Sequence, residues 1–138
     1  MFKKTLLAMV LGAIGLFVSL DQAAAQLSPP PGGIKRTVLQ KVDVPGSTYE
    51  VVLVLAEIPA KAGLGRHTHP GTESATVTEG ELTLKVDGQP DKVMKAGESW
   101  LLAAGTIHDA ITGDKPCKVI VAYAVEKGKP LATPAAAK

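Results

Sequence analysis

The sequence contains few of the residues on which several protein classes depend. Its single cysteine, Cys117, excludes an internal disulfide, and only 4% of its residues are aromatic. The formal net charge is +2 with no basic cluster, so nucleic-acid binding is not expected. We expect Cys117 to be buried and inert, with an intermolecular disulfide as the alternative. A core with so few aromatic rings must depend on aliphatic packing, helped by a partner subunit.

The first 25 residues have the layout of a secretory signal peptide. A short basic start at 1–4 is followed by an apolar run at 6–20 and three alanines at 23–25. The run of about fifteen residues is shorter than the roughly twenty that a membrane span needs. We therefore expect residues 1–25 to be removed and the mature protein to be periplasmic or secreted, without membrane attachment. An uncleaved N-terminal anchor is the alternative.

The remaining chain is the size of one domain, about 113 residues with a net charge of about +1. Residues 26–33 contain three prolines followed by two glycines, which is typical of an extended linker. We expect one domain over residues 34–127. Residues 128–138, which end in Pro-Ala-Ala-Ala-Lys, are expected to be a flexible tail.

Short apolar segments separated by glycine and proline predict an all-β fold, a sandwich or a barrel. Residues 49–58 form the strongest strand candidate, residues 82–86 alternate apolar and polar side chains, and Asp87-Gly88 is a hairpin turn signal. The segments 51–56 and 119–125 are apolar on both faces. One small barrel interior cannot cover all of these faces, so we expect a homodimer that buries one or both outer faces.

The three histidines of the chain lie in two places, together with one glutamate. His67 and His69 are two residues apart, so their imidazoles share one face of an extended segment. Glu73 follows a Pro-Gly break, and His108 lies in the segment 99–112, which is expected to contain another strand. Three imidazoles and a carboxylate that face a common interior can bind a divalent first-row metal.

These residues resemble the two signature motifs of the cupin superfamily. In the first motif the opening glycine is replaced by Lys61, and the matching residues are His67, His69, Glu73 and Gly80. In the second motif Ala103 and Thr112 replace a proline and an asparagine, and the matching residues are Gly97, Gly105 and His108.

The resemblance covers roughly residues 35–127 and implies a jelly-roll β-barrel, the double-stranded β-helix. It implies that His67, His69, Glu73 and His108 bind one divalent transition metal, which the sequence leaves open among Fe, Mn, Ni, Cu and Zn. A degenerate cupin that binds a ligand without metal is the alternative. Glu98, Trp100 and Tyr123 are candidates to line the pocket, although a tryptophan in the core is the more ordinary explanation for Trp100.

Two classes of function fit this site. The first is a metal-dependent oxygenase or isomerase that acts on a small molecule, with Glu73 as the catalytic residue, either as a fourth ligand or as a general base. The second is a non-catalytic module or sensor that binds a small ligand or the metal itself. A simple secreted β-domain with an unused pocket is a third interpretation. Fold membership alone does not choose among them.

Overall fold

The computed structural model describes residues 33–136, which form ten strands. The expected signal peptide and linker lie outside these residues, apart from Gly33. Within the described range no helix is long and apolar enough to cross a membrane. The strands are β1 Lys35–Asp43, β2 Tyr49–Ile58, β3 His67–Thr68, β4 Thr72–Glu79, β5 Glu81–Val86, β6 Lys92–Lys95, β7 Ser99–Leu102, β8 His108–Thr112, β9 Cys117–Glu126 and β10 Thr133–Pro134.

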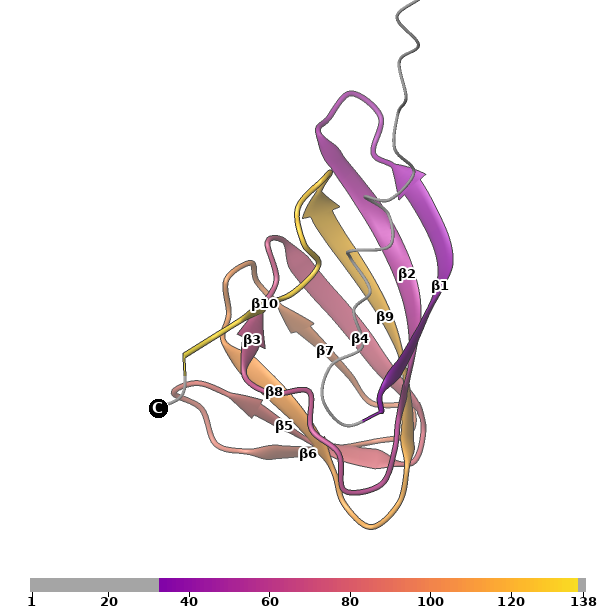
Figure 1. Ribbon diagram of the computed structural model, residues 1–138, viewed down its shortest axis with the longest axis vertical. Coiled ribbons are helices and arrows are strands. Elements are labelled where there is room, and N and C mark those ends of the chain that lie inside the picture. The colour runs from indigo at the N-terminus through magenta and orange to yellow at the C-terminus, as the bar shows by residue number, and fades with distance from the viewer. Residues whose placement is uncertain (1–32, 137–138) are drawn as a thin grey trace, which may run out of the picture.

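The strands form two five-stranded antiparallel sheets, and this confirms the predicted all-β cupin fold. The larger sheet has the order β1-β2-β9-β4-β7, and the smaller sheet has the order β10-β3-β8-β5-β6. Figure 1 shows β1 and β2 on the right, with β3, β8, β5 and β6 on the left and below. The strand predicted over residues 49–58 coincides with β2. From β2 onwards the chain alternates between the sheets, apart from the β5–β6 hairpin, and β3 and β8 become neighbours, which brings His67 and His108 together.

The hydrophobic core lies between the two sheets. Strands β2 and β9 alternate buried and half-buried residues along their whole length, because one face of each strand points into the core. Met94, Val125 and Cys117 are fully buried, and the thiol belongs to this aliphatic core as expected. Burial raises the pKa of Cys117 to about 11, so it is a protonated, unreactive thiol at neutral pH.

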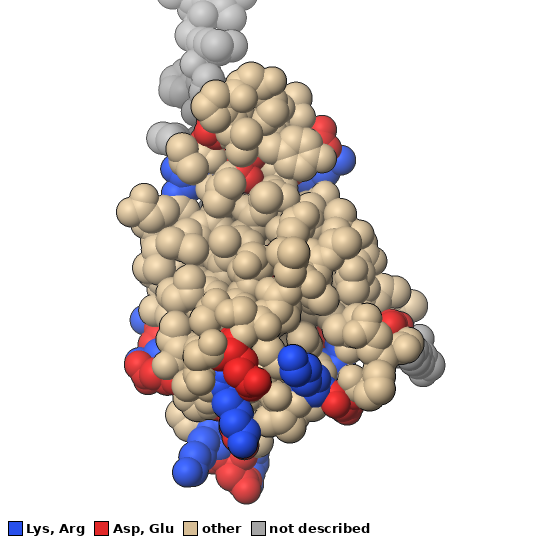
Figure 2. Space-filling view, turned by 180° about the vertical axis from the view of Figure 1, so that it is seen from behind, with Lys and Arg blue, Asp and Glu red and all other residues tan. Residues whose placement is uncertain are grey.

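The outer face of the larger sheet carries no charge across its middle. One cross-strand row consists of residues of β1, β2, β9, β4 and β7 in register, namely Gln40, Leu53, Ala122, Ser74 and Leu101. The next row lies two residues further along β2, β9, β4 and β7. It contains Leu55, Ile120, Thr76 and Ser99. Seen from behind, the molecule presents a broad uncharged area with charged side chains gathered towards its two ends (Figure 2).

The C-terminal segment differs from the flexible tail that the sequence suggests. Strand β10 pairs with β3 through Thr133–Thr68 and Pro134–His67. Leu131 is buried, and the backbone nitrogen of Ala135 donates to the carbonyl of Arg66. In the structure, residues 131–135 therefore lie along β3, the strand that carries the first histidine.

Candidate metal centre

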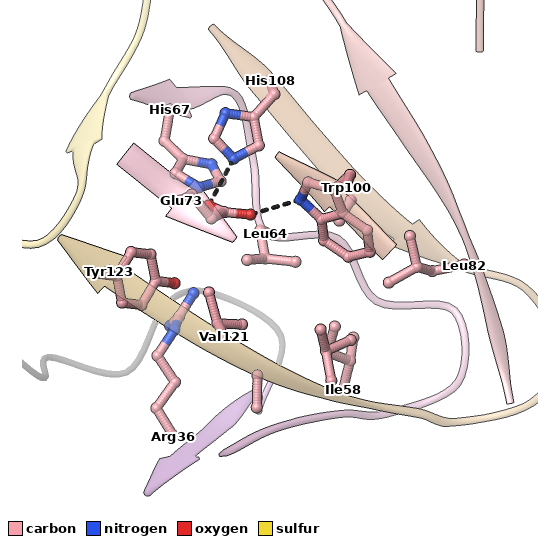
Figure 3. Close-up of a pocket in the computed structure, with 13 residues that line it drawn as sticks. Arg36, Ile58, Leu64, His67, Glu73, Leu82, Trp100, His108, Val121 and Tyr123 are labelled. Carbon is pink, nitrogen blue, oxygen red and sulfur yellow. Dashed lines mark hydrogen bonds and ion pairs between the residues drawn. The ribbon is translucent and has the colours of Figure 1, made fainter. Parts of the chain in front are cut away.

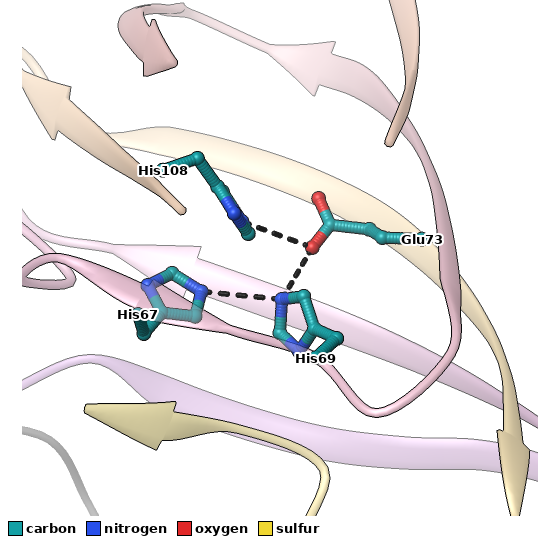
Figure 4. A group of neighbouring side chains, drawn as sticks. All are labelled: His67, His69, Glu73 and His108. Atoms are coloured by element: carbon teal, nitrogen blue, oxygen red, sulfur yellow. Dashed lines mark hydrogen bonds and ion pairs between the residues drawn. The ribbon is translucent and has the colours of Figure 1, made fainter. Parts of the chain in front are cut away.

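The structure brings the four predicted ligands together between the two sheets. His67, His69, Glu73 and His108 are all buried, and one potential ligand atom from each lies within 4.8 Å of the others. The Nε2 atoms of His69 and His108 lie 2.6 and 3.3 Å from Oε2 of Glu73. The Nε2 atoms of His67 and His69 are 3.2 Å apart. Figure 4 shows the three rings and the carboxylate around one common point.

Backbone pairing places the side chains. His67 on β3 lies directly opposite His108 on β8, which brings their ring centroids to 4.2 Å. The chain then turns at Pro70-Gly71 and enters β4 of the larger sheet, where Glu73 pairs with Tyr123 of the neighbouring strand β9. A Cβ atom on Gly71 would lie 1.9 Å from the carbonyl oxygen of Ala124. Only glycine allows the backbone at position 71 to lie this close to β9. This close packing fixes the course of the chain between His69 and Glu73.

Hydrogen bonds to backbone carbonyls fix the tautomer of all three imidazoles. Nδ1 of His67 lies 2.7 Å from the carbonyl of Gly65, and Nδ1 of His108 lies 3.0 Å from the carbonyl of Thr106. Nδ1 of His69 lies 2.5 Å from the carbonyl of Leu131. A carbonyl oxygen only accepts, so each Nδ1 carries the hydrogen and each neutral ring turns an Nε2 lone pair towards the centre.

Glu73 is fixed from its other side by a tryptophan. The indole Nε1 of Trp100 donates to Oε1 of Glu73 at 2.7 Å, which leaves Oε2 facing the imidazoles (Figure 3). Trp100 and Tyr123 line the pocket as expected. Glu98 does not: it is exposed, and its carboxylate accepts a hydrogen bond from the backbone nitrogen of Lys95 in the turn that follows β6. That part of the prediction was wrong because Glu98 belongs to the turn before β7.

The electrostatics at His67 and Glu73 favour the protonation states that metal ligands need. Burial lowers the pKa of His67 to about 4, so its ring is neutral at pH 7. Burial would raise the pKa of Glu73, but hydrogen bonds from His108 and His69 outweigh it and hold that pKa below its usual value. At His108 burial lowers the pKa, but the hydrogen bond to Glu73 outweighs burial and raises the pKa, so a metal ion has to displace a proton from this ring.

The donor set fits a divalent metal. With hydrogen on each Nδ1, the Nε2 lone pairs of His67 and His69 face each other at 3.2 Å, and that of His69 faces an ionised carboxylate oxygen at 2.6 Å. Such contacts between acceptors are repulsive unless a cation lies among them. The hydrogen bonds on Nδ1 are the outer partners that orient imidazoles in metal sites.

Two of the three departures from the cupin motifs, Lys61 and Thr112, have visible structural consequences. Lys61, at the position of the opening glycine, has φ 56° and is the one non-glycine residue of the described chain with a positive φ. Thr112, at the position of the asparagine, is buried; its hydroxyl accepts from the nitrogen of Ala62 at 3.0 Å and donates to the carbonyl of Pro59 at 2.5 Å. Both residues therefore preserve the loop that leads into His67.

Two residues at the site, Leu131 and Arg36, were not predicted from the sequence. Leu131 supplies the carbonyl that orients His69, and the only available signal was one large apolar residue in a tail of small and charged ones. Arg36 of β1 lines the pocket between the sheets. Its position two residues after the apolar Ile34 was a weak signal, because residues two apart in an extended segment share a face.

Comparison with known families agrees with this geometry. A family model described as "Cupin domain" matches residues 54–123, just over half of the chain, and the match includes all four candidate ligands. The chain belongs to the cupin family. No match was found among curated proteins.

Solved cupin-fold structures resemble the chain in fold. The polyketide cyclase RemF from Streptomyces resistomycificus has a TM-score of 0.64 at 22% identity, over 81% of this chain and 79% of the cyclase. The DMSP lyase DddQ from Ruegeria pomeroyi DSS-3 has a TM-score of 0.63 at 19% identity, over 73% of this chain and 51% of the lyase. Two structures of oxalate oxidase in complex with glycolate each have a TM-score of 0.58 at 22% identity. They cover 76% and 77% of this chain and 56% and 57% of the oxidase. This cupin thus spans about half the length of the lyase and the oxidase.

Proposed function

We propose that this cupin binds one divalent transition metal through Nε2 of His67, His69 and His108 and through Oε2 of Glu73. One observation carries the proposal: the backbone holds all three Nδ1–H groups, so in the neutral rings three Nε2 lone pairs converge with a carboxylate oxygen. Neutral imidazoles suit Fe, Mn, Ni, Cu and Zn, and the carboxylate favours the harder ions Fe(II) and Mn(II).

The proposed site leaves room for a small molecule. Four protein ligands leave one or two positions free on a five- or six-coordinate ion, as in catalytic rather than structural sites. When bound, the metal acts as a Lewis acid on an oxygen of that molecule. The adjoining pocket has a cavity volume of about 30 Å³ and is lined mainly by apolar side chains, so it accepts a compact ligand.

The reaction class proposed is oxygenation or isomerisation of a small molecule. The solved neighbours include a cyclase, a lyase and an oxidase, three different reactions on one fold, so the fold does not select the chemistry. Both oxygens of Glu73 are engaged, Oε1 by Trp100 and Oε2 by the imidazoles. This arrangement supports Glu73 as a ligand, and its role as a general base stays a prediction.

A non-catalytic binding module is the second candidate, and the small cavity favours it. A library of small metabolites, screened by thermal shift on the metal-loaded protein and followed by product analysis, separates the two. A compound that stabilises the protein and is consumed supports the enzyme. Compounds that bind and are recovered unchanged contradict the enzyme and support the module. In the enzyme, Glu73→Gln lowers turnover while the variant remains folded.

We further propose that the protein is exported and that a second copy covers the outer face of the larger sheet. The N-terminal layout supports export. N-terminal sequencing of the protein from the periplasm or medium tests it, with Gln26 as the expected first residue. The uncharged cross-strand rows centred on Leu53 and Leu55 support the dimer.

A further inference from the structure

Arg36 occupies an inward position in the barrel that an aliphatic residue would ordinarily take. It pairs across β1 and β2 with Ala56, which is buried and points into the pocket. Ile34, two residues earlier on the same face, is also buried. Figure 3 shows the Arg36 side chain rising from β1 so that its guanidinium group lies beside Tyr123 and below Glu73.

The guanidinium group has no protein partner among the described residues. The chain has two arginines, and the other one, Arg66, forms an ion pair with Asp87 and donates to the carbonyl of Ala136. No described residue forms a hydrogen bond or an ion pair with Arg36, and its charge acts on the nearby phenol of Tyr123. Glu73 is the one carboxylate in the pocket lining, and its two oxygens are already engaged by Trp100 and the histidines.

A half-buried arginine among apolar side chains costs free energy unless an anion pairs with it. Arg36 is half-buried, and the other neighbours in the lining include Ile58, Val119 and Val121. A charged group among apolar side chains loses hydration that nothing in the pocket restores. A guanidinium group presents a planar set of donors that matches a carboxylate through two parallel hydrogen bonds.

The net charge of the proposed site also favours an anionic ligand. A divalent metal with three neutral imidazoles and one carboxylate has a net charge of +1, and Arg36 adds another positive charge in the same pocket. Tyr123 lines the same pocket beside Arg36, and its hydroxyl can donate a hydrogen bond to an anion (Figure 3). The cavity volume of about 30 Å³ exceeds the ~10–15 Å³ that one water molecule requires, so the anion has few non-hydrogen atoms.

We propose that the pocket binds a small carboxylate whose anionic group pairs with Arg36 while its other end lies against the metal centre. The inference rests on the proposed metal site and assigns a chemical class to its ligand. Arg36 selects for negative charge, and the apolar lining limits the size of the rest of the molecule.

Acetate is a suitable probe, with acetamide as its uncharged analogue of the same size. The full chain is loaded with Co(II), whose visible absorption reports the metal, and acetate binding is measured by calorimetry at constant ionic strength. The test variant is Arg36→Gln. The control is Lys35→Gln, which removes a neighbouring charge whose ammonium group is exposed and paired with Glu57 at 2.9 Å.

Wild type and Lys35→Gln should bind acetate with the same Kd, and Arg36→Gln should raise that Kd at least about tenfold, the effect of losing a charge-assisted hydrogen bond. Acetamide should bind no better to wild type than to Arg36→Gln. Equal acetate affinities in wild type and Arg36→Gln, or no acetate binding by the Co(II)-loaded wild type, overturn the role of Arg36 and leave the metal site standing. A wild type that takes up no Co(II) overturns both.

Discussion

Nδ1 of His69 donates a hydrogen bond of 2.5 Å to the carbonyl oxygen of Leu131, which lies 62 residues later in the chain. The Leu131 side chain is buried, and β10, two residues further on, pairs with β3 beside His67. The C-terminal segment is therefore part of the histidine site. The contact fixes the ring orientation of a ligand through a residue that cannot itself bind the metal.

Truncation after Pro130 should weaken metal binding. The shortened chain loses the acceptor that orients His69, and the loss of such an outer partner typically reduces metal affinity about 10–100-fold. Competition with a chelator of known affinity, measured on full-length and truncated protein, gives the change. A chain that ends at Ala136 retains Leu131 and β10 and serves as the control. Equal affinity in all three proteins would show that the Leu131 contact does not matter for the site.

Lys61→Gly should stabilise the protein. Lys61 has φ 56°, a conformation that costs a non-glycine residue about 1 kcal/mol and that glycine adopts freely. Its ion pair with Asp114 joins two exposed side chains and contributes little. Thermal unfolding should show a higher Tm for Lys61→Gly. Lys61→Ala, which loses the ion pair but keeps the Cβ atom, should be no more stable than wild type; a matching gain there would locate the effect in the side chain instead.

The strands and the metal ligands could be predicted because their signals are local. Strand β2 follows from an unbroken apolar run, and His67 and His69 share a face through the period of two. The remaining candidate ligands, Glu73 and His108, were assigned from their spacing in the two cupin motifs. None of these inferences required knowledge of which strands are neighbours.

Arg36 and Leu131 could not be assigned in this way because their roles depend on distant pairing. The one local signal for Arg36 is the apolar Ile34 two residues earlier, and alternation beyond it ends at the irregularity of β1 between Val38 and Gln40. The face of Arg36 becomes clear only from its partner, Ala56. Leu131 contributes a backbone carbonyl, which leaves no trace in the residue type.

The metal-free protein should lose stability in acid partly through His67. Burial lowers its pKa from 6.5 to about 4, so between these pH values the unfolded chain binds a proton that the folded chain does not. The unfolded state is therefore favoured as the pH falls through this window, by up to about 3 kcal/mol. His108, whose pKa is raised, acts in the opposite sense.

Denaturant unfolding of wild type and His67→Gln, both freed of metal by a chelator, isolates this effect. Both proteins retain His108 and Glu73, so the difference between them reports His67. The free energy of unfolding of wild type should decline relative to the variant from pH 7 to about 4. A difference that stays constant over this range would contradict a neutral, buried His67.

Leu53→Lys should dissociate the proposed dimer. Leu53 lies at the middle of the uncharged outer row, opposite Ala122, and a lysine there would place two like charges near the centre of a symmetric interface. Light scattering should give a dimer for wild type and a monomer for the variant. Lys92→Glu on β6, in the other sheet, should leave the mass unchanged. A monomeric wild type at micromolar concentration would rule out the dimer.

The metal content of the purified protein tests the central claim most directly. Elemental analysis is made on protein exported through its own N-terminal segment, and on His69→Ala and Glu73→Ala variants shown to be folded. We expect about one equivalent of a single transition metal in wild type and its loss in His69→Ala, since His69 is one of four residues whose ligand atoms lie within 4.8 Å of one another. A wild type that contains no metal and takes up none on titration would contradict it.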